Sequence, residues 1–260
     1  MSTPSVSHDR RVEASSADQE LARIVARNRL LDALAGEARG SLAPHLERVT
    51  LEIGDTLARA GERWSYLYFP EGAAVSVLKR MDDGRAMEVG TIGNEGIVGL
   101  PAILGADASE ADTVVPIPGL ALRAPVEVVR DVIHQHPRLL DVVHRYTQAY
   151  LAQVAQNAAC NQLHSLEQRC ARWLLATHDR VGGVDVLPLK HEYLAMMLGT
   201  YRPAVSVAVG ALQRRKLISY RRGRMHVVDR AGLAAAACEC YRTVRQEFER
   251  LVPIATNGSR

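Results

Sequence analysis

Six cationic side chains lie within residues 214–224 of this 260-residue chain. Lysine and arginine at such density bind phosphate groups, because each phosphate they neutralise releases condensed counterions. A charge run can also be only a solvated surface. A tight turn would hold like charges close together here, which favours phosphate binding and nucleic acid as the partner. The six are Arg214, Arg215, Lys216, Arg221, Arg222 and Arg224, with Tyr220 among them.

The cysteines are the residues that could bind a metal. Cys238 and Cys240 are closer than the usual ligand spacing of two intervening residues, and Cys160 and Cys170 have no near partner along the chain. The spacing therefore predicts neither a zinc site nor an iron–sulfur cluster. We expect four reduced thiols packed on helices, no metal and no cofactor.

The segment before the basic run predicts two helices joined at Gly199. Apolar residues recur at i, i+3, i+4 and i+7 in the second helix, which is the period of one buried helix face. Two short helices around a glycine are typical of a helix-turn-helix, whose second helix enters the DNA major groove. A helical hairpin in an ordinary core would show the same spacing. The apolar positions are Leu194, Ala195, Met197 and Leu198, then Val205, Ala208, Val209 and Leu212.

The basic run itself predicts a β-hairpin. Residues 217–220 and 225–228 are rich in β-formers, and Arg221, Arg222 and Gly223 punctuate them as a turn. A hairpin after a helix-turn-helix makes a winged helix. The expected DNA-contacting residues are Lys190, His191, Tyr201, Arg202, Pro203, Ser206, Val207, Gln213, Arg221, Arg222 and Arg224.

The front half of the chain has the sequence pattern of a small β-roll. Between residues 49 and 123, short apolar and β-branched segments alternate with turns, of which Asp82-Asp83-Gly84 is the clearest. The predicted fold class is α+β, with an N-terminal jelly-roll-like β-roll, a long helix and a C-terminal winged helix-turn-helix. We expect a disordered arm at 1–20, the roll domain at 21–136, a dimerisation helix at 137–160, the DNA-binding domain at 161–250 and a tail at 251–260.

A heptad seam along the long helix predicts a homodimer. The helix begins near Arg138 and runs towards Asn157, with apolar positions alternating by three and four. The alternative is that this stripe packs on the chain's own roll. The seam residues are Leu140, Val143, Thr147, Tyr150 and Val154.

Charge is distributed unevenly along the chain. Residues 159–260 carry 16 Lys+Arg against 8 Asp+Glu, and the remainder carries 16 against 21. An acidic front and a basic back suggest a sensor or assembly module fused to a nucleic-acid binder. The chain contains no run of eighteen apolar residues, which a membrane-spanning helix would need. Its polar N-terminus lacks the apolar centre of a signal peptide. We therefore expect a cytoplasmic protein without a membrane partner.

These parts together resemble the Crp/Fnr family of bacterial transcription regulators, which combine a cyclic-nucleotide-binding-like roll with a winged helix-turn-helix. The most specific segment is LGTYRPAVS at 198–206, which is similar to the family's Leu-Gly-x-Thr-Arg-Glu-x-Val-Ser. Leu217-Ile218, Arg222-Gly223 and GNEGIVG at 93–99 also match. The resemblance implies a homodimer on double-stranded DNA with inverted symmetry, and contact with RNA polymerase in an activator.

The resemblance also assigns roles in DNA reading. The family's first base-reading arginine falls on Arg202, which can donate two hydrogen bonds to guanine. Its glutamate falls on Pro203 and its second arginine on Val207, so the preferred half-site should differ from the family's best known one. Tyr201 and Ser206, together with Lys190 and His191, would bind phosphate oxygens.

The expected effector pocket departs further from the family. Where cyclic-nucleotide-binding members carry a glutamate and then an arginine, this chain reads Gly-Leu-Pro at 99–101 and Glu-Ala-Asp at 110–112. A buried phosphate needs a cationic or N–H-rich partner, so we do not expect cyclic AMP or cyclic GMP to bind. No cysteine precedes Cys160, so the Fnr-type N-terminal cluster is missing too. The effector is unknown at this stage.

Two alternatives stay open. A roll of this kind also builds cupin-type metal enzymes, which need two or three imidazoles in the barrel. Residues 49–123 contain no histidine, and His134 and His136 lie at a predicted helix end, which disfavours an enzyme. The roll could also be a ligand-free dimerisation scaffold in a DNA-binding regulator.

Overall fold

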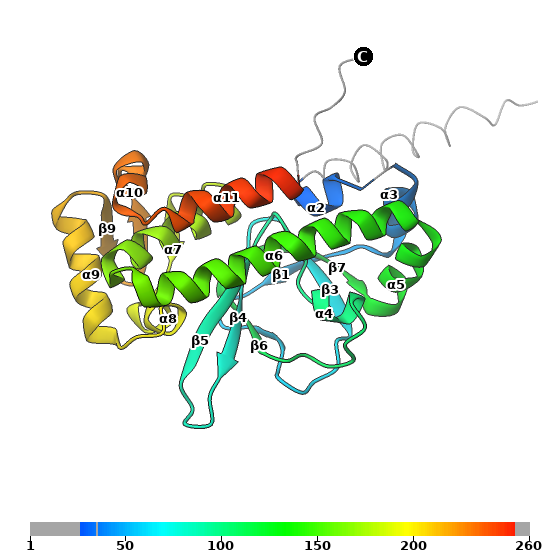
Figure 1. The fold of residues 1–260 in the computed structure, drawn as a ribbon, viewed down its shortest axis with the longest axis horizontal. Helices are drawn as coiled ribbons and strands as arrows, with labels where there is room; N and C mark the ends of the chain where they lie inside the picture. The colour runs from blue at the N-terminus through cyan, green and yellow to red at the C-terminus, as the bar shows by residue number, and fades with distance from the viewer. Residues whose placement is uncertain (1–26, 35, 253–260) are drawn as a thin grey trace, which may run out of the picture.

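The computed structural model describes residues 27–34 and 36–252. The arm expected at 1–20, the first residues of the roll domain expected from residue 21, and residues 253–260 of the expected tail lie outside this range. The described chain forms an antiparallel β-roll, one long helix α6 (Pro137–Leu163) beside it, and a winged helix-turn-helix at the opposite end of the molecule (Figure 1). The predicted fold class is confirmed.

Two antiparallel sheets make up the β-roll, with strand orders β1-β7-β3 and β2-β6-β4-β5. Side chains alternate between the faces of a strand, so Leu51, Val75 and Val115 meet in one buried core. The Met81–Arg85 turn forms as predicted, with Gly84 at φ +84°. The strands are β1 (Glu47–Leu51), β2 (Thr56–Ala58), β3 (Tyr66–Pro70), β4 (Ala74–Arg80), β5 (Ala86–Ile92), β6 (Asp112–Ile117) and β7 (Gly119–Pro125).

Short helices cover one end of the roll. Pro125 precedes α5 (Val126–Gln135), where its fixed φ suits a helix start. The buried Asn28 caps α2, and its amide donates to the carbonyls of Pro70 and Gly96, both at 2.9 Å, which ties this end to the roll. The other elements here are α2 (Arg29–Asp32), α3 (Gly36–Leu42), the 3-10 helix η1 (Ala43–His45) and α4 (Leu100–Ile103).

Helix α6 packs so closely on the roll that glycines are required beneath it. A Cβ at Gly90 would collide with Tyr150, and one at Gly96 would collide with Tyr146. Tyr146 is completely buried, and its hydroxyl donates to the carbonyl of Ile97 at 3.3 Å. The face of α6 that these tyrosines share therefore packs against the chain's own roll.

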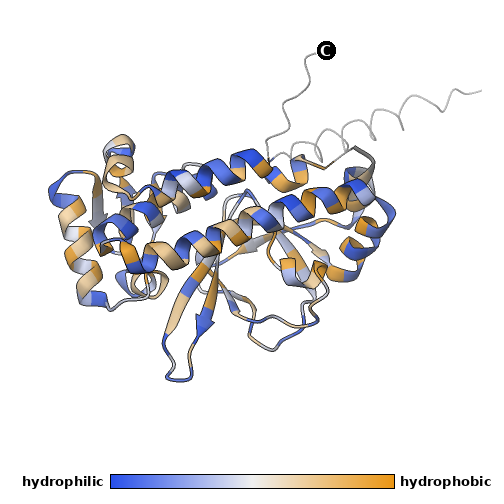
Figure 2. Cartoon of the chain, viewed as in Figure 1, coloured by the Kyte–Doolittle hydropathy of each residue, from blue (hydrophilic) through white to orange (hydrophobic). Residues whose placement is uncertain are grey.

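This packing changes the expected dimer seam. Val143 is 3% exposed and belongs to the chain's own core, and Tyr150 packs partly buried against the roll, so neither is free to contact a second chain. Leu140 is 37% exposed, and Thr147 and Val154 are half-buried. Leu151, which the heptad reading missed, is 56% exposed. Hydrophobic and hydrophilic residues accordingly mix along the whole of α6 (Figure 2).

The C-terminal part is a winged helix, whose buried core also includes Ala74, Leu78 and Ile117 of the roll. Helix α7 (Leu166–Arg180) begins with a capping box of Ser165 and Gln168, in which each side chain bonds the other's backbone N–H. The three-stranded wing sheet has the order β8-β10-β9. The further elements are β8 (Val186–Pro188), α8 (His191–Met197), α9 (Arg202–Arg214), β9 (Ile218–Arg221), β10 (Arg224–Val227) and α10 (Arg230–Ala236).

The last helix, α11 (Cys240–Leu251), returns from the winged helix to the first domain. It runs beside α6 (Figure 1). The ring of Phe248 lies 6.2 Å from that of Tyr146, and Arg29 Nη2 donates to the carbonyl of Val252 at 3.0 Å. The sequence predicted residues 161–250 only as the DNA-binding domain and predicted no packing of residues 240–251 against α6.

A buried ion pair joins the two domains beneath α11. Arg180 of α7 donates from Nε to Glu95 Oε1 at 2.7 Å, and its side chain also bonds Gln153 of α6. Both charged side chains are at least 90% buried. Gly93 allows this approach, because a Cβ there would collide with Arg180. Trp173 Nε1 adds a second link by donating to Glu88 Oε1 of β5 at 3.0 Å.

The Arg180→Met substitution should destabilise the chain strongly. Removing one partner of a buried pair leaves the Glu95 carboxylate uncompensated, which costs about 3–5 kcal/mol in the free energy of unfolding. Chemical denaturation measures the difference. Arg250→Met, at the exposed pair with Glu247, is the matched control and should leave the midpoint unchanged within error. Equal effects of the two substitutions would contradict a special role for the Arg180–Glu95 pair.

Candidate nucleic-acid interface

The helix-turn-helix forms where the sequence predicts it. Helices α8 and α9 are joined by residues 198–201, and Gly199 adopts φ +60°, a left-handed conformation that favours glycine. A Cβ on Gly199 would also collide with Met87 of β5. The predicted apolar residues of α9 all lie on its buried face: Val205, Ala208, Val209 and Leu212.

The opposite face of α9 is open to a partner. Tyr201 precedes the helix and is 69% exposed, and Val207 in its second turn is 70% exposed. Ser206 and Pro203 are exposed beside them. Pro203 sits in the first turn, where a missing N–H costs no intrahelical hydrogen bond. Large apolar side chains at such exposure, on a helix whose other face is packed, mark a contact surface.

Arg202 stands at the start of this face and is held by one carboxylate. Its Nε lies 2.9 Å from Glu192 Oε1 of α8, and both side chains are more than half exposed. An exposed ion pair of this kind contributes little stability, so the guanidinium can exchange Glu192 for another acceptor at small cost. The pair holds Arg202 at the start of α9 and leaves its guanidinium able to bind another acceptor.

His191 is bound within the protein rather than free. Its Nδ1 lies 3.0 Å from Ser206 Oγ, and its ring stacks on Tyr220 of the wing at 4.2 Å between centroids. Desolvation and the nearby Arg202 charge lower the pKa of His191, so the imidazole is neutral at pH 7. His191 therefore links α8, α9 and the wing in this structure.

The wing carries the cations on a tight turn. Arg222 and Gly223 adopt φ 51° and 77° between β9 and β10, which are the two positive angles of a type I′ hairpin turn. Arg221, Arg222 and Arg224 are all exposed. Arg222 holds a conformation that a glycine or asparagine would adopt at lower cost, so its presence there points to a use for the side chain.

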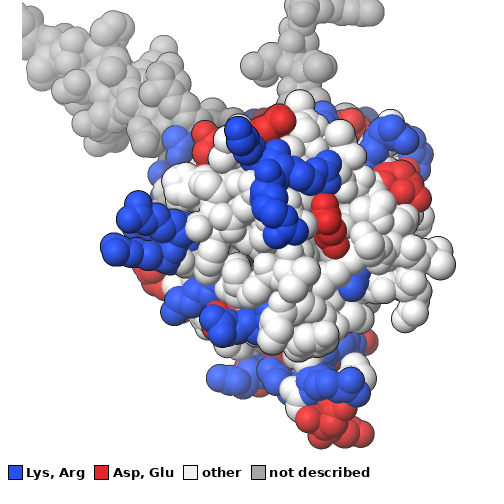
Figure 3. All heavy atoms as spheres, turned by 90° about the vertical axis from the view of Figure 1, so that its left-hand side faces the viewer, with Lys and Arg blue, Asp and Glu red and all other residues white. Residues whose placement is uncertain are grey.

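The remaining residues of the basic run differ in whether a carboxylate of the chain pairs with them. Arg214 and Lys216 are exposed, whereas Arg215 Nη1 lies 2.9 Å from Glu167 Oε1 of α7. Gln213 is half-buried near the end of α9, and Lys190 is exposed at the N-cap of α8. At this end of the molecule, several separate groups of Lys and Arg surround a broad uncharged area, with few acidic residues (Figure 3). The expected DNA-contacting residues thus gather at one end of the chain.

The roll encloses a cavity at the place expected for an effector. Gly99, Leu100 and Pro101 line it together with Glu110 and Ala111, so both stretches that the resemblance assigned to the pocket lie at one cavity. The volume is about 180 Å³. Most of the other lining side chains are apolar or aromatic: Trp64, Val77, Val89, Ile92, Val98, Tyr146, Tyr150 and Val154.

One ion pair is the charged feature of this cavity. Lys79 Nζ donates to the carbonyl oxygen of Glu110 at 2.6 Å and lies 3.7 Å from its Oε2. Both side chains are exposed, Lys79 by 43% and Glu110 by 78%.

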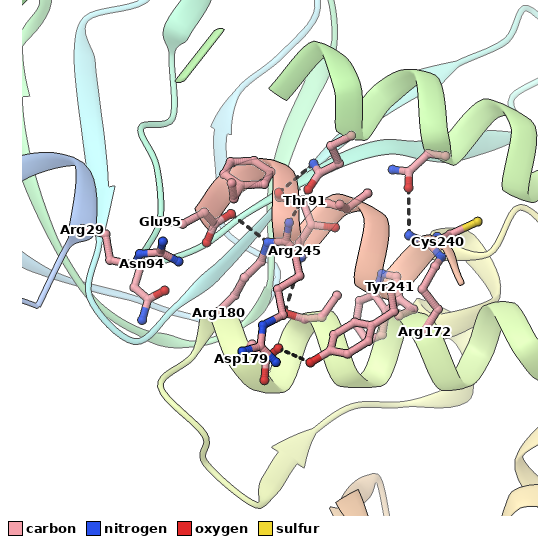
Figure 4. A pocket seen from close by; sticks show the side chains of 16 residues that line it. Arg29, Thr91, Asn94, Glu95, Arg172, Asp179, Arg180, Cys240, Tyr241 and Arg245 are labelled. Atoms are coloured by element: carbon pink, nitrogen blue, oxygen red, sulfur yellow. Dashed lines mark hydrogen bonds and ion pairs between the residues drawn. The ribbon is translucent and has the colours of Figure 1, made fainter. Parts of the chain in front are cut away.

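A second, smaller cavity of about 80 Å³ lies at the domain junction (Figure 4). Arg180 there points to Glu95, and Tyr241 Oη donates to Asp179 Oδ2 at 2.6 Å. Arg172 and Arg245 lie on the same walls. This polar pocket is the space left between α6, α7, α11 and the roll, and it adjoins Cys240.

Three of the four cysteines lie together although they are distant in the sequence. Cys160, Cys238 and Cys240 form one buried cluster of free thiols, and His164 lies beside them. The spacing along the chain did not predict this cluster, because α11 folds back on α6. Cys160 and His164 are four residues apart at the end of one helix, which places both on one face; that spacing with Cys-Glu-Cys was the signal available. Cys170 is separate and buried in the winged-helix core.

Comparison with known proteins agrees with the geometry. Residues 48–136 match the family model of the cyclic nucleotide-binding domain, and residues 168–236 match that of the Crp-like helix-turn-helix domain. The global nitrogen regulator of Nostoc is 23% identical over 198 residues, which cover 73% of this chain and 88% of the relative. The chain belongs to the Crp/Fnr family of transcription regulators.

Solved structures share the fold. FixK2 from Bradyrhizobium japonicum superposes with a TM-score of 0.63 at 14% identity, covering 74% of this chain and 98% of that one. The c-di-GMP-responsive global regulator CLP from Xanthomonas campestris gives a TM-score of 0.59 at 17% identity, with 74% and 99% covered. Within residues 27–34 and 36–252, the helices are too short or too polar to cross a bilayer.

Acid should weaken the winged helix through His191. The unfolded imidazole has a pKa of about 6.5, and the folded one has a lower pKa, so the unfolded state takes up the proton first as pH falls. Stability is therefore lost below about pH 6.5 and is unaffected by this group above it. Thermal unfolding midpoints at pH 7.5 and pH 5.5 should differ less in His191→Gln than in the wild type. An equal drop in both proteins would show that His191 contributes nothing to the acid sensitivity.

Proposed function

We propose that this protein is a homodimeric regulator that binds an inverted-repeat DNA site through α9 and the wing. The observation that carries the proposal is the exposed face of α9, where Arg202 stands at the helix start and Val207 follows one turn later. A helix with this exposed face and a packed opposite face fits the major groove. The relatives named above are transcription regulators, which supports a regulator rather than an enzyme.

Direct readout in this proposal depends on Arg202. Its guanidinium can donate two hydrogen bonds to guanine O6 and N7, in exchange for the exposed Glu192. Pro203 offers no hydrogen bond to a base, and Val207 offers only methyl groups to thymine. The wing arginines and Lys190 would bind phosphates and fix the register of the helix.

The exposed side of α6 supports a dimer. Five residues of α6 follow one another at intervals of seven, four, three and four residues, which keeps them on one side of the helix. They are Leu140, Thr147, Leu151, Val154 and Ala158. The seam proposed here keeps three of the predicted residues and replaces the two buried ones with Leu151 and Ala158. Two copies joined along it would present two recognition helices, and half-sites one helical turn apart match such a pair.

The roll cavity supports a small, largely apolar effector better than a cyclic nucleotide. Its walls are mainly aliphatic and aromatic, and Lys79, the cation among its lining residues, is 43% exposed. A buried phosphate would need a cationic or N–H-rich partner inside the cavity. A ligand of this class would contact Tyr146 and Tyr150 of α6, so its occupancy could be transmitted to the dimer helix.

Arg202→Ala should remove sequence discrimination. On DNA enriched by the wild-type chain from a random pool, the loss should be about 1–3 kcal/mol, or about 5- to 150-fold in Kd. On scrambled DNA of the same length the affinity should change little. Fluorescence anisotropy with both DNAs measures the ratio.

The contrasting variant in the same titrations is Arg222→Gln at the wing tip. It should weaken both DNAs alike and reduce the slope of log K against log salt by about 1. If Arg202→Ala also weakened both DNAs alike, the assignment of the reading face of α9 would be wrong.

Leu151→Glu should convert the dimer to a monomer. A carboxylate placed on an apolar seam would be buried against its own symmetry mate, which is strongly unfavourable. Light scattering coupled to size exclusion gives the mass directly. Gln148→Glu, which adds the same charge to the neighbouring exposed side of α6, should remain dimeric. A dimeric Leu151→Glu variant would place the interface elsewhere.

A further inference from the structure

Four potential metal ligands converge where α6 ends and α11 begins. They are Cys160 and His164 from the end of α6, and Cys238 and Cys240 from the start of α11. One ligand atom from each, three sulfurs and an imidazole nitrogen, lies within 4.8 Å of all the others. Segments that are about eighty residues apart in sequence thus meet at one point.

The distances match those between the ligands of a single tetrahedral ion. Zinc binds thiolate sulfur at about 2.3 Å and imidazole nitrogen at about 2.0–2.1 Å, so adjacent ligand atoms around it lie about 3.5–3.8 Å apart. Cys160 Sγ lies 3.5 Å from Cys238 Sγ, and Cys240 Sγ lies 3.5 Å from His164 Nδ1. The set is too compact for a multi-iron cluster, whose protein ligands are distributed over two or more irons.

The surrounding residues orient these ligands. His164 Nε2 lies 3.2 Å from Glu239 Oε1, so the carboxylate accepts the ring proton at Nε2 and leaves Nδ1 free to bind a metal. Such carboxylate–histidine pairs are the usual support of metal-binding imidazoles. Gln156 Nε2 donates to Cys240 Sγ at 3.0 Å, which is the hydrogen bond a thiolate ligand requires.

Charge and burial are suited to a thiolate site. Cys160, Cys238 and Cys240 are each at least 96% buried, and His164 keeps part of its side chain exposed as a route of entry. A hydrogen bond from Cys238, together with the charge of Arg172, lowers the pKa of Cys160, whereas the pKa of Cys238 is raised by its hydrogen bond with Cys160 and the pKa of Cys240 is raised by burial. Cys170 lies apart from this cluster, and burial together with the charge of Glu167 raises the pKa of its thiol to about 12.

We propose that Cys160, His164, Cys238 and Cys240 bind one zinc ion in a closed tetrahedral site that fastens α11 to the end of α6. Four protein ligands leave no open position, so the role is structural rather than catalytic. The ion cross-links the dimer helix to the segment that follows the winged helix. From that point α11 carries Tyr241 to Asp179 and Phe248 to Tyr146, so the metal sets the position of the whole return helix.

The test uses the full-length chain, purified with a reductant, stripped with a chelator and reloaded with zinc. Elemental analysis should find one tightly bound zinc per chain. Cobalt should replace it and give the intense visible bands of a tetrahedral ion together with a thiolate charge-transfer band. Removing zinc should lower the thermal unfolding midpoint, because an ion that binds only the folded state stabilises it.

Variants separate this site from adventitious binding. Cys238→Ser should weaken the thiolate band and the zinc affinity, and Glu239→Gln should lower that affinity by about 10–100-fold while keeping all four ligands. Cys170→Ala is the matched control and should keep one zinc and the full cobalt spectrum. If Cys238→Ser fails to fold, Glu239→Gln still tests the site, because it keeps all four ligands.

Three results would overturn the proposal. The first is a wild-type chain that retains no zinc after reloading and shows no tetrahedral cobalt spectrum. The second is zinc affinity that is unchanged in both Cys238→Ser and Glu239→Gln. The third is a Cys160–Cys238 disulfide in the reductant-free protein, seen as the loss of two hydrogens in the intact mass, with no metal bound by the reduced form.

Discussion

The arrangement of the two domains depends on the buried ion pair between Arg180 and Glu95. Arg180 leaves the end of α7 in the DNA-binding domain and enters a space that Gly93 keeps open in the roll. Neither charge is accessible to water, so each is stable only while the other is present. The pair therefore couples the position of the winged helix to the roll, and a change in the roll near residues 93–96 reaches α7 directly.

Close packing against the roll also fixes the position of α6. Glycines at 90 and 96 let Tyr150 and Tyr146 lie directly on the roll, and these two rings also form part of the wall of the roll cavity. One side of α6 thus lines the cavity, while its exposed side carries Leu151 and the proposed dimer seam. Helix α11 packs along α6, and Phe248 of α11 contacts Tyr146.

The sequence predicted what depends on local pattern. The period of residues 205–212, the glycine at 199 and the Arg222-Gly223 turn each determine structure within a few residues, and all three formed as expected. The seam of α6 was harder, because a heptad does not record which side a neighbouring sheet will cover. The cysteine cluster and the Arg180–Glu95 pair were missed because both depend on contacts across about eighty residues.

The central claim is that two copies of this chain read DNA with twofold symmetry through α9. Selection of bound sequences from random DNA with the full-length protein tests it most directly. The account predicts an enriched inverted repeat whose half-site centres lie about 10–10.5 base pairs apart, or a multiple of that, with a guanine in each half-site. Enrichment of a single unrepeated element, or of no sequence at all, would contradict it.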